Sequence, residues 1–189
     1  CRINIDKNNI DSLSSILRAF ENYDRKDLLN IYAAPVRRHT KESESYCFDY
    51  SEYNEVFDNI FGVLYEHGLL ADIDFFAPKR KVTCCSTRAT NEIVVDTKGN
   101  LYKCMQTATS DQYAVGTCRN GLEYNSELAK WLIPQTPEEC KECIYMPICQ
   151  AGCKGFRSLN NPLVSPCVNE KYYIDTILKY IYIISEDKK

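Results

Sequence analysis

Cysteine spacing is the feature of this chain that could do chemistry. Around one glycine, Gly99, the cysteines follow the order C-x13-G-x4-C, a gap, C-x2-C-x5-C-x3-C, a second gap, and a last C. The thiols of this pattern are Cys85, Cys104, Cys140, Cys143, Cys149, Cys153 and Cys167. Thiolates are soft ligands, and so many in one ordered set favour polynuclear iron or zinc sites over isolated buried cysteines.

Disulfide bonding is the alternative use of these thiols. The chain has 11 cysteines among 189 residues, and 44% of its residues are hydrophobic. Disulfide frameworks are typical of small secreted domains that lack a sufficient core, whereas this chain is long enough to bury one. An odd number of cysteines also leaves at least one outside any closed framework. We therefore expect metal-ligating thiolates in a reducing cytoplasm.

Charge and hydropathy argue against two classes of partner. The net charge is −3, so the chain carries no basic footprint for nucleic acid and no polybasic patch for a membrane surface. Its apolar stretches are far shorter than the roughly 20 residues that a membrane span needs, and no signal peptide is recognisable. We expect neither nucleic acid nor a membrane as a partner.

The first 77 residues alternate strand and helix patterns. Residues 2–6 alternate polar and apolar side chains as a strand does, and apolar residues recur at helical spacing over 13–20. The elements expected next are a strand over 28–34, a polar loop over 36–50, a helix over 56–64 that ends at Gly68, and a strand over 69–76. This order predicts parallel strands with helical crossovers, but it is too short to close an eight-stranded barrel.

The pattern changes near Pro78. Two short strands, 92–96 and 101–105, flank Thr97-Lys98-Gly99-Asn100, which is a hairpin turn signal. Loops, a short helix over 126–132 and the cysteine-rich segment follow, and a helix over 171–184 closes the chain. We expect two domains, residues 1–77 and residues 78–189.

The complete cysteine pattern resembles that of the SPASM domain, the C-terminal extension of a subset of radical S-adenosylmethionine (radical SAM) enzymes. The resemblance covers about residues 80–185, and its seven-part spacing is far more specific than one CxxC. It implies an α/β fold in which the last βα units of a partial (β/α) barrel precede a small hairpin, loop and helix domain. The chain then looks like the C-terminal part only of such an enzyme.

The resemblance also implies two auxiliary 4Fe-4S clusters. Carried over residue by residue, the first cluster would be held by Cys140, Cys143, Cys149 and Cys167, and the second by Cys85, Cys104 and Cys153. We call these sets the Cys140 group and the Cys104 group. Family members differ in the fourth ligand of the second cluster, because some add a cysteine and others leave an iron open. The candidates for that place are Cys84 and Cys118.

The spacing leaves the arrangement of Cys149 and Cys153 open. Being four residues apart, they share one face if the segment is helical, and otherwise they can serve two neighbouring centres. Backbone N–H groups of the turn Gln150-Ala151-Gly152-Cys153 are the hydrogen-bond donors that we expect near the sulfurs.

The N-terminal strand is similar to strands of the radical SAM barrel. Arg2, Asn4 and Asp6 share one face of a strand over 2–6. The resemblance implies that this polar face lines a ligand site, so Asn4 and Asp6 are predicted to contact S-adenosylmethionine in the complete enzyme. A strand that turns this face to solvent is an equally weighted alternative.

Two departures from the family pattern bear on function. The Cx3Cx2C motif of radical SAM catalysis is absent, because position 156, where its third cysteine would follow Cys149 and Cys153, is Phe156. We expect the motif upstream in a longer enzyme, and we expect this chain alone not to cleave S-adenosylmethionine. Met105 stands where sulfatase-maturing members carry a proton-removing Asp, which weakens that subclass and leaves other peptide-modifying members open.

Two classes of function follow. In the first, the chain is the iron–sulfur region of a radical SAM enzyme that modifies a peptide or protein and receives electrons from a reductant such as flavodoxin or ferredoxin. Its auxiliary clusters would dock a substrate thiol at an open iron or transfer electrons. In the second, it is a non-catalytic zinc module for protein interaction, because a CxxC with two further cysteines also satisfies tetrahedral zinc.

Overall fold

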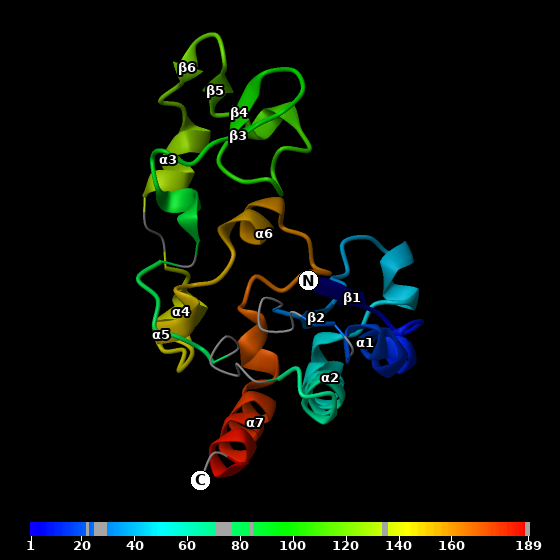
Figure 1. Ribbon diagram of the computed structural model, residues 1–189. Helices are drawn as coiled ribbons and strands as arrows, with labels where there is room; N and C mark the ends of the chain where they lie inside the picture. Colours follow the sequence, from blue (N-terminus) through cyan, green and yellow to red (C-terminus); the bar gives the residue numbers. More distant parts are fainter. Residues whose placement is uncertain (22, 25–29, 71–76, 84, 134–135, 188–189) are drawn as a thin grey trace. The chain divides into compact units, whose positions relative to one another are not determined.

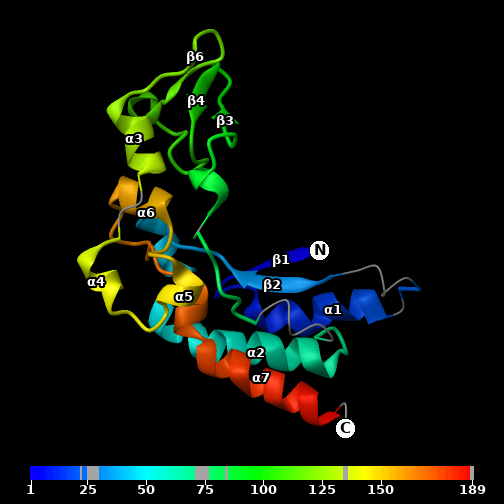
Figure 2. The ribbon, with the colours of Figure 1, turned by 90° about the vertical axis from the view of Figure 1, so that its left-hand side faces the viewer.

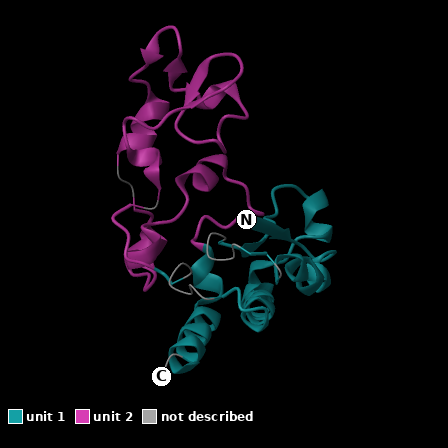
Figure 3. Cartoon of the chain, viewed as in Figure 1, with its two compact units in different colours: residues 1–78, 169–189 teal, residues 79–168 magenta. Residues whose placement is uncertain are grey.

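The computed structural model describes residues 1–21, 23–24, 30–70, 77–83, 85–133 and 136–187. The chain divides into two compact units: unit 1 is residues 1–78 with 169–189, and unit 2 is residues 79–168 (Figure 3). In the described ranges no helix combines the length and apolar character that crossing a membrane would take.

The last helix belongs to unit 1. This helix, α7 (Ile174–Asp187), packs against α2 (Tyr53–Glu66), although the sequence divides the chain near Pro78 and assigns α7 to the second domain. Compact units and family domains need not coincide, because a terminal helix can pack back onto an earlier segment. The division at 77/78 therefore stays a prediction about family domains.

Unit 1 begins with a β-α-β arrangement. Strand β1 (Arg2–Ile5) pairs in parallel with β2 (Tyr32–Pro35), and α1 (Leu13–Glu21) lies between them in the chain. Parallel neighbours need such a crossover, so the parallel order expected from the sequence is confirmed. The expected strand over 28–34 begins outside the described residues, and the observed strand includes Pro35, which was expected to stop it.

Aromatic rings fill the contact between α2 and α7, which lie side by side in Figures 1 and 2. The rings of Phe57 and Tyr173 are stacked with centroids 3.6 Å apart. Gly62 allows Tyr180 to approach, since a Cβ at Gly62 would lie 3.1 Å from the Tyr180 hydroxyl. The core of unit 1 includes the buried residues Ile5, Leu13, Leu17, Ala33, Phe57, Ile60, Phe61, Leu64, Tyr173 and Ile177.

The ends of the expected elements in unit 1 agree in part with the structure. Helix α2 ends before Gly68, whose φ of +65° suits a glycine at that position, as predicted. The segment 36–50, expected to be a loop, contains the 3-10 helix Glu42–Ser45 and the start of another at Tyr50–Glu52. Residues 71–76, most of the expected third strand, lie outside the described residues.

Unit 2 contains a small antiparallel sheet in the order β3-β4-β5-β6. Its strands are β3 (Val94–Val95), β4 (Asn100–Tyr102), β5 (Gly116–Thr117) and β6 (Gly121–Leu122). The other elements are the 3-10 helices Ser86–Arg88 and Asp111–Tyr113, α3 (Ser126–Leu132), α4 (Glu138–Lys141), α5 (Met146–Cys149) and α6 (Lys154–Leu159). A hydrophobic cluster of this unit includes the buried residues Leu101, Val115, Leu128 and Trp131, and Tyr102, Phe156 and Val164 are also buried.

The predicted hairpin between β3 and β4 is present, with shorter strands than expected. Gly99 has a φ of +83°, and the Asp96 carboxylate accepts hydrogen bonds from the backbone N–H groups of Lys98 and Asn100 at 2.9 and 2.8 Å. Desolvation opposes ionisation of Asp96, but the hydrogen bonds from Asn100 and Lys98 outweigh it and hold the pKa of Asp96 below its ordinary value. The turn thereby fixes the direction of β4, which leads into Cys104.

Candidate iron–sulfur site

The Cys104 group gathers thiols from three segments of unit 2. Burial raises the pKa of the Cys104 thiol, and the neighbouring thiols of Cys153 and Cys85 raise it further. Cys85 precedes the 3-10 helix Ser86–Arg88, Cys104 follows β4, and Cys153 precedes α6. The structure therefore brings together the three residues that the resemblance assigns to the second cluster.

A glycine makes room for the Cys104 sulfur. A Cβ added at Gly155 in α6 would lie 2.9 Å from the Sγ of Cys104 and 3.8 Å from the Sγ of Cys153. Glycine in a helix costs about 1 kcal/mol relative to alanine, so it needs a packing reason. Here the reason is the sulfur pair that lies against the helix backbone.

A buried lysine joins two of these segments. The ammonium group of Lys103 donates to the carbonyl oxygens of Ala89 and Glu92, both at 2.6 Å, and the residue is fully buried. Burial lowers the pKa of Lys103. Because Lys103 immediately precedes Cys104 and Ala89 lies four residues after Cys85, these bonds hold the two cysteine-bearing segments next to each other.

The Cys140 group forms around α4 and α5. Burial raises the pKa of the Cys140 thiol, the Arg157 guanidinium opposes this effect, and the thiols of Cys167 and Cys149 raise the pKa further. Cys140 and Cys149 are both buried. Cys143 is half-buried in the turn after α4, where its N–H donates to the carbonyl of Cys140 at 3.3 Å.

A break in the helix separates Cys149 from Cys153. Helix α5 ends at Cys149, and the next three residues, Gln150, Ala151 and Gly152, have positive φ values of 52°, 65° and 73°. The segment is therefore not one helix. Cys149 and Cys153 do not share a helix face, which was one of the two arrangements that their spacing allowed. Cys149 lies with the Cys140 group and Cys153 with the Cys104 group.

The same turn brings Cys167 into the site. A Cβ at Gly152 would lie 2.1 Å from the carbonyl oxygen of Pro166, so only glycine allows this approach. The N–H of Cys153 donates to the same oxygen at 2.6 Å. These contacts hold the segment that carries Cys167 against the turn.

The expected hydrogen-bond donors of this turn are engaged elsewhere. The N–H groups of Gln150, Gly152 and Cys153 donate to the carbonyls of Met146, Cys149 and Pro166, so the prediction that they serve the sulfurs is wrong for these three. A backbone N–H turned inward by a left-handed turn finds a nearby carbonyl, which is a stronger acceptor than sulfur.

Other groups donate to the sulfurs instead. The backbone N–H groups of Gln106 and Thr107 lie near enough to the Cys104 thiol to lower its pKa in part, although that of Thr107 donates to the Cys104 carbonyl at 3.0 Å. The Nη2 atom of Arg157 lies 3.2 Å from the Sγ of Cys140. The sequence analysis missed these donors and Gly155. A glycine inside a helical segment was the one available signal, because the donors depend on which segments meet.

The remaining predicted residues lie apart from these groups or outside the described chain. Cys118 is exposed and its N–H donates to the Gly99 carbonyl at 2.7 Å, beside the hairpin turn. Because β4 lies between Gly99 and Cys104, Cys118 lies beside the hairpin turn at the other end of this strand, and its role as a fourth ligand stays a prediction. Cys84 lies outside the described residues.

Asn4 and Asp6 belong to unit 1. Asn4 is exposed and accepts a hydrogen bond from Arg2 at 2.9 Å, and Asp6 accepts one from the backbone of Asn8 at 2.8 Å. Their contact with S-adenosylmethionine stays a prediction.

Thiolates are the usual protein ligands of iron–sulfur clusters, and they also bind single zinc ions. Among the described residues, no three Cys, His, Asp or Glu side chains lie close enough to hold a single metal ion, although the thiols gather in two groups. A 4Fe-4S cluster binds each thiolate to a different iron, so its ligand sulfurs lie farther apart than those around one zinc ion. The hydroxyl of Thr87, two residues after Cys85, is buried without a hydrogen-bond partner in the described chain, as a polar group facing an additional group would be.

Comparison with known proteins gives structural neighbours and no sequence relatives. No family model matches the chain, and no curated protein matches it. The chain is similar to solved structures of native anSMEcpe, an anaerobic sulfatase-maturating radical SAM enzyme with a SPASM domain. The structure of this enzyme with bound AdoMet and Cp18Cys peptide has a TM-score of 0.59 and 16% sequence identity to this chain. The match covers 100% of this chain and 58% of the enzyme's chain.

Two further structures of this enzyme agree. The form with AdoMet has a TM-score of 0.55 and 15% identity, covering 97% of this chain and 56% of its own. The form with AdoMet and Kp18Cys peptide has a TM-score of 0.55 and 15% identity, covering 98% and 57%. The chain thus spans somewhat more than half the length of these structures, and the likeness shows a mixed α/β fold, as expected from the sequence.

Proposed function

We propose that this chain is the auxiliary-cluster region of a radical SAM enzyme with a SPASM domain, which modifies a peptide or protein. The observation that carries the proposal is the partition of the thiols. Cys104 has Cys85 and Cys153 as neighbours, whereas Cys140 has Cys149 and Cys167. This is the division that the resemblance to the SPASM domain implies, and the fold likeness to a radical SAM enzyme also supports the proposal.

The chain's own residues have definable roles in such a site. When bound, the 4Fe-4S clusters supply one-electron transfer or an open iron for a substrate ligand. The N–H groups of Gln106 and Thr107 and the guanidinium of Arg157 lie where they stabilise negative charge on ligand sulfurs. The burial of Cys140 and Cys149 limits the access of water to these two thiols.

The Cys104 group is the proposed place for substrate docking. Among the described residues it has three thiols, so a fourth position is open to Cys84, to Cys118 or to a substrate thiol. A substrate-docking role predicts that turnover depends on a substrate thiol, whereas an electron-transfer role does not.

The complete enzyme is proposed to use S-adenosylmethionine, a peptide or protein substrate and a reductant such as flavodoxin or ferredoxin, in the cytoplasm. The neighbouring structures contain AdoMet and peptides, which supports S-adenosylmethionine and a peptide as partners. Met105 is exposed and carries no acid at the position where sulfatase-maturing members have an Asp, so we favour another peptide modification. Without a Cx3Cx2C motif, this chain by itself is proposed not to cleave S-adenosylmethionine.

Iron and acid-labile sulfide in anaerobically reconstituted protein test the proposal. Two clusters predict about eight irons and eight sulfides per chain, with visible iron–sulfur absorbance. Fewer than about four irons would contradict the two-cluster proposal. Stoichiometric zinc in a colourless protein after strictly anaerobic purification would favour the zinc module instead.

A further inference from the structure

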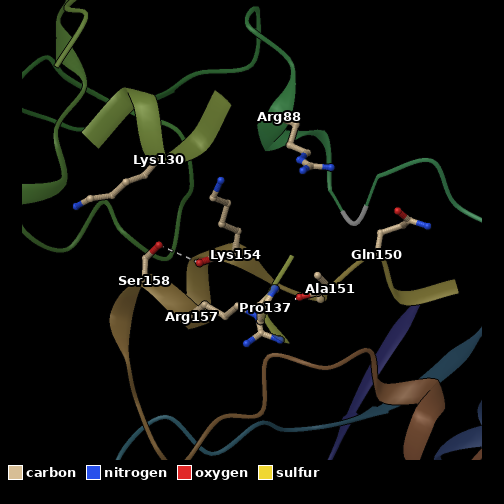
Figure 4. Close-up of a pocket in the computed structure, with 9 residues that line it drawn as sticks. Arg88, Lys130, Pro137, Gln150, Ala151, Lys154, Arg157 and Ser158 are labelled. Carbon is tan, nitrogen blue, oxygen red and sulfur yellow. Dashed lines mark hydrogen bonds between the residues drawn. The ribbon is translucent and has the colours of Figure 1, made fainter. Parts of the chain in front are cut away.

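A cavity of about 210 Å³ in unit 2 has a lining rich in cations (Figure 4). Arg88 comes from the 3-10 helix after Cys85, Lys130 from α3, and Lys154 and Arg157 from α6. The lining is completed by Pro137, Gln150, Ala151, Gly152 and Ser158. The described residues of the lining include four cations and no carboxylate, in a chain whose net charge is −3.

Lys130 and Arg157 are paired with carboxylates outside the lining. The Nζ of Lys130 lies 2.8 Å from Glu127, and the Nη1 of Arg157 lies 3.0 Å from Glu139. These pairs lower the positive charge of the cavity without cancelling it, because the guanidinium of Arg88 adds a further charge.

Arg88 is the cation best suited to meet a ligand. Its side chain is half-buried, and within the described part of the chain no hydrogen bond or ion pair engages its guanidinium. Lys154, by comparison, donates to the neutral carbonyls of Trp131 and Ile133 at 3.3 and 3.2 Å. A half-buried guanidinium beside other cations attracts an anion more strongly than an exposed one does.

The size and chemistry of the cavity favour the carboxylates of a peptide. A space of about 210 Å³ accepts one or two side chains but not a folded partner. Arginine and lysine donors match carboxylate oxygens, while the aliphatic stems of these side chains with Pro137 and Ala151 suit a peptide's methylene groups. No aromatic ring among the described lining residues offers a base a stacking surface, which disfavours nucleic acid.

We propose that this pocket docks an acidic segment, with Asp or Glu side chains, of the peptide that the enzyme modifies. The proposal rests on the proposed function for the identity of the peptide. Arg157 links the two sites, since its guanidinium lines the pocket and also donates to the Cys140 sulfur. A peptide docked here would lie next to a residue that contacts a cluster ligand.

Fluorescence anisotropy with the full, anaerobically reconstituted chain tests the pocket. The probes are a labelled Glu-rich peptide, the same peptide with Gln in place of Glu, and inorganic phosphate as a competitor. The variants are Arg88→Gln and Lys130→Gln, with Arg119→Gln as the control, because Arg119 is exposed in the turn between β5 and β6 and outside the lining.

The Glu-rich peptide should bind and the Gln-rich peptide should not, with affinity falling as salt rises. Arg88→Gln should weaken binding roughly tenfold, Lys130→Gln less, and Arg119→Gln should leave it unchanged. Equal binding of both peptides, an equal loss in the control, or unchanged binding in both pocket variants would overturn the proposal. Phosphate that binds as tightly as the peptide would also overturn it, in favour of a site for a free anion.

Iron and sulfide measured in the same samples keep the two proposals apart. Protein with its full iron that does not bind the acidic peptide rejects the pocket alone. Protein without iron–sulfur clusters that still binds the acidic peptide through Arg88 rejects the cluster proposal and retains an anion-binding pocket. If the Arg88→Gln variant keeps its full iron content, its weaker peptide binding does not come from loss of the cluster that the nearby Cys85 would hold.

Discussion

At the scale of single residues, the candidate site depends on contacts that the cysteine pattern does not contain. Gly155 leaves room for the Cys104 sulfur, and Arg157 donates to the Cys140 sulfur. Neither residue is a metal ligand by chemistry. Gly155 affects the Cys104 sulfur by lacking a side chain, and Arg157 affects the Cys140 sulfur by its positive charge. Substitutions of Gly155 and Arg157 therefore test how the ligand sulfurs are positioned without removing a ligand.

Gly155→Ala should selectively impair the Cys104 group. In an exposed helix, alanine would be more stable than glycine by about 1 kcal/mol, but here the added Cβ would lie 2.9 Å from the Cys104 sulfur. We expect reconstituted protein to lose about four irons per chain and to keep the other cluster. Ser158→Ala in the same helix is the control, and equal iron in Gly155→Ala and wild type would contradict this role.

At the scale of elements, unit 2 positions its cysteines by fixing loops to short strands and helices. The left-handed turn after α5 separates Cys149 from Cys153, and Gly152 lets the Pro166 segment approach. Lys103 fastens the segment after Cys85 to the strand that leads into Cys104. Because these contacts engage the backbone of neighbouring segments, the thiols can be brought together by elements too short to be stable alone.

Lys103→Met should destabilise unit 2. Methionine fills a similar volume, but it removes both hydrogen bonds that the buried Lys103 ammonium donates to the carbonyls of Ala89 and Glu92, at a cost of about 1–3 kcal/mol. We expect a lower melting temperature and less iron retained after purification. Lys98→Met is the matched control, because Lys98 is exposed at the hairpin and its contact with Asp111 is 3.4 Å long. Equal melting temperatures for the two variants would refute the role assigned to Lys103.

At the scale of the whole molecule, the two units have cores of different extent. Unit 1 buries an aromatic and aliphatic core around α2 and α7, whereas the buried cluster described in unit 2 is smaller, with Leu101, Val115, Leu128 and Trp131. A small core stabilises a chain segment poorly unless metal or covalent links add to it. We infer that unit 2 depends on bound clusters for stability and that unit 1 does not.

Removal of the clusters should therefore affect the units differently. After oxidative loss of iron from the full chain, hydrogen exchange measured by mass spectrometry should show faster exchange over residues 79–168. Exchange in α2 and α7 should change little, because their contacts lie within unit 1. Uniformly faster exchange across both units, or no change in unit 2, would be incompatible with this dependence.

Part of this architecture was predictable because it depends on local signals. The helical spacing of apolar residues predicted α1, α2, α3 and α7, and Thr97-Lys98-Gly99-Asn100 predicted the hairpin. The β-α-β order predicted the parallel pairing of β1 with β2. These signals act over a few residues or follow from the crossover that parallel strands require. They do not fix where an element ends, so the predicted strand lengths and the limits of the loop over 36–50 were less accurate.

The amino-acid sequence by itself determined the chemistry of the ligands, since the number, type and order of the thiols are covalent facts. Only the tertiary structure decided which thiols meet, that Cys118 lies beside the hairpin turn, and that α7 packs in unit 1. Spacing allowed Cys149 and Cys153 to share one centre or two. The choice depended on backbone dihedral angles at Gln150, Ala151 and Gly152 and on the approach of Pro166, because contacts between distant segments have no signature in the spacing of either one.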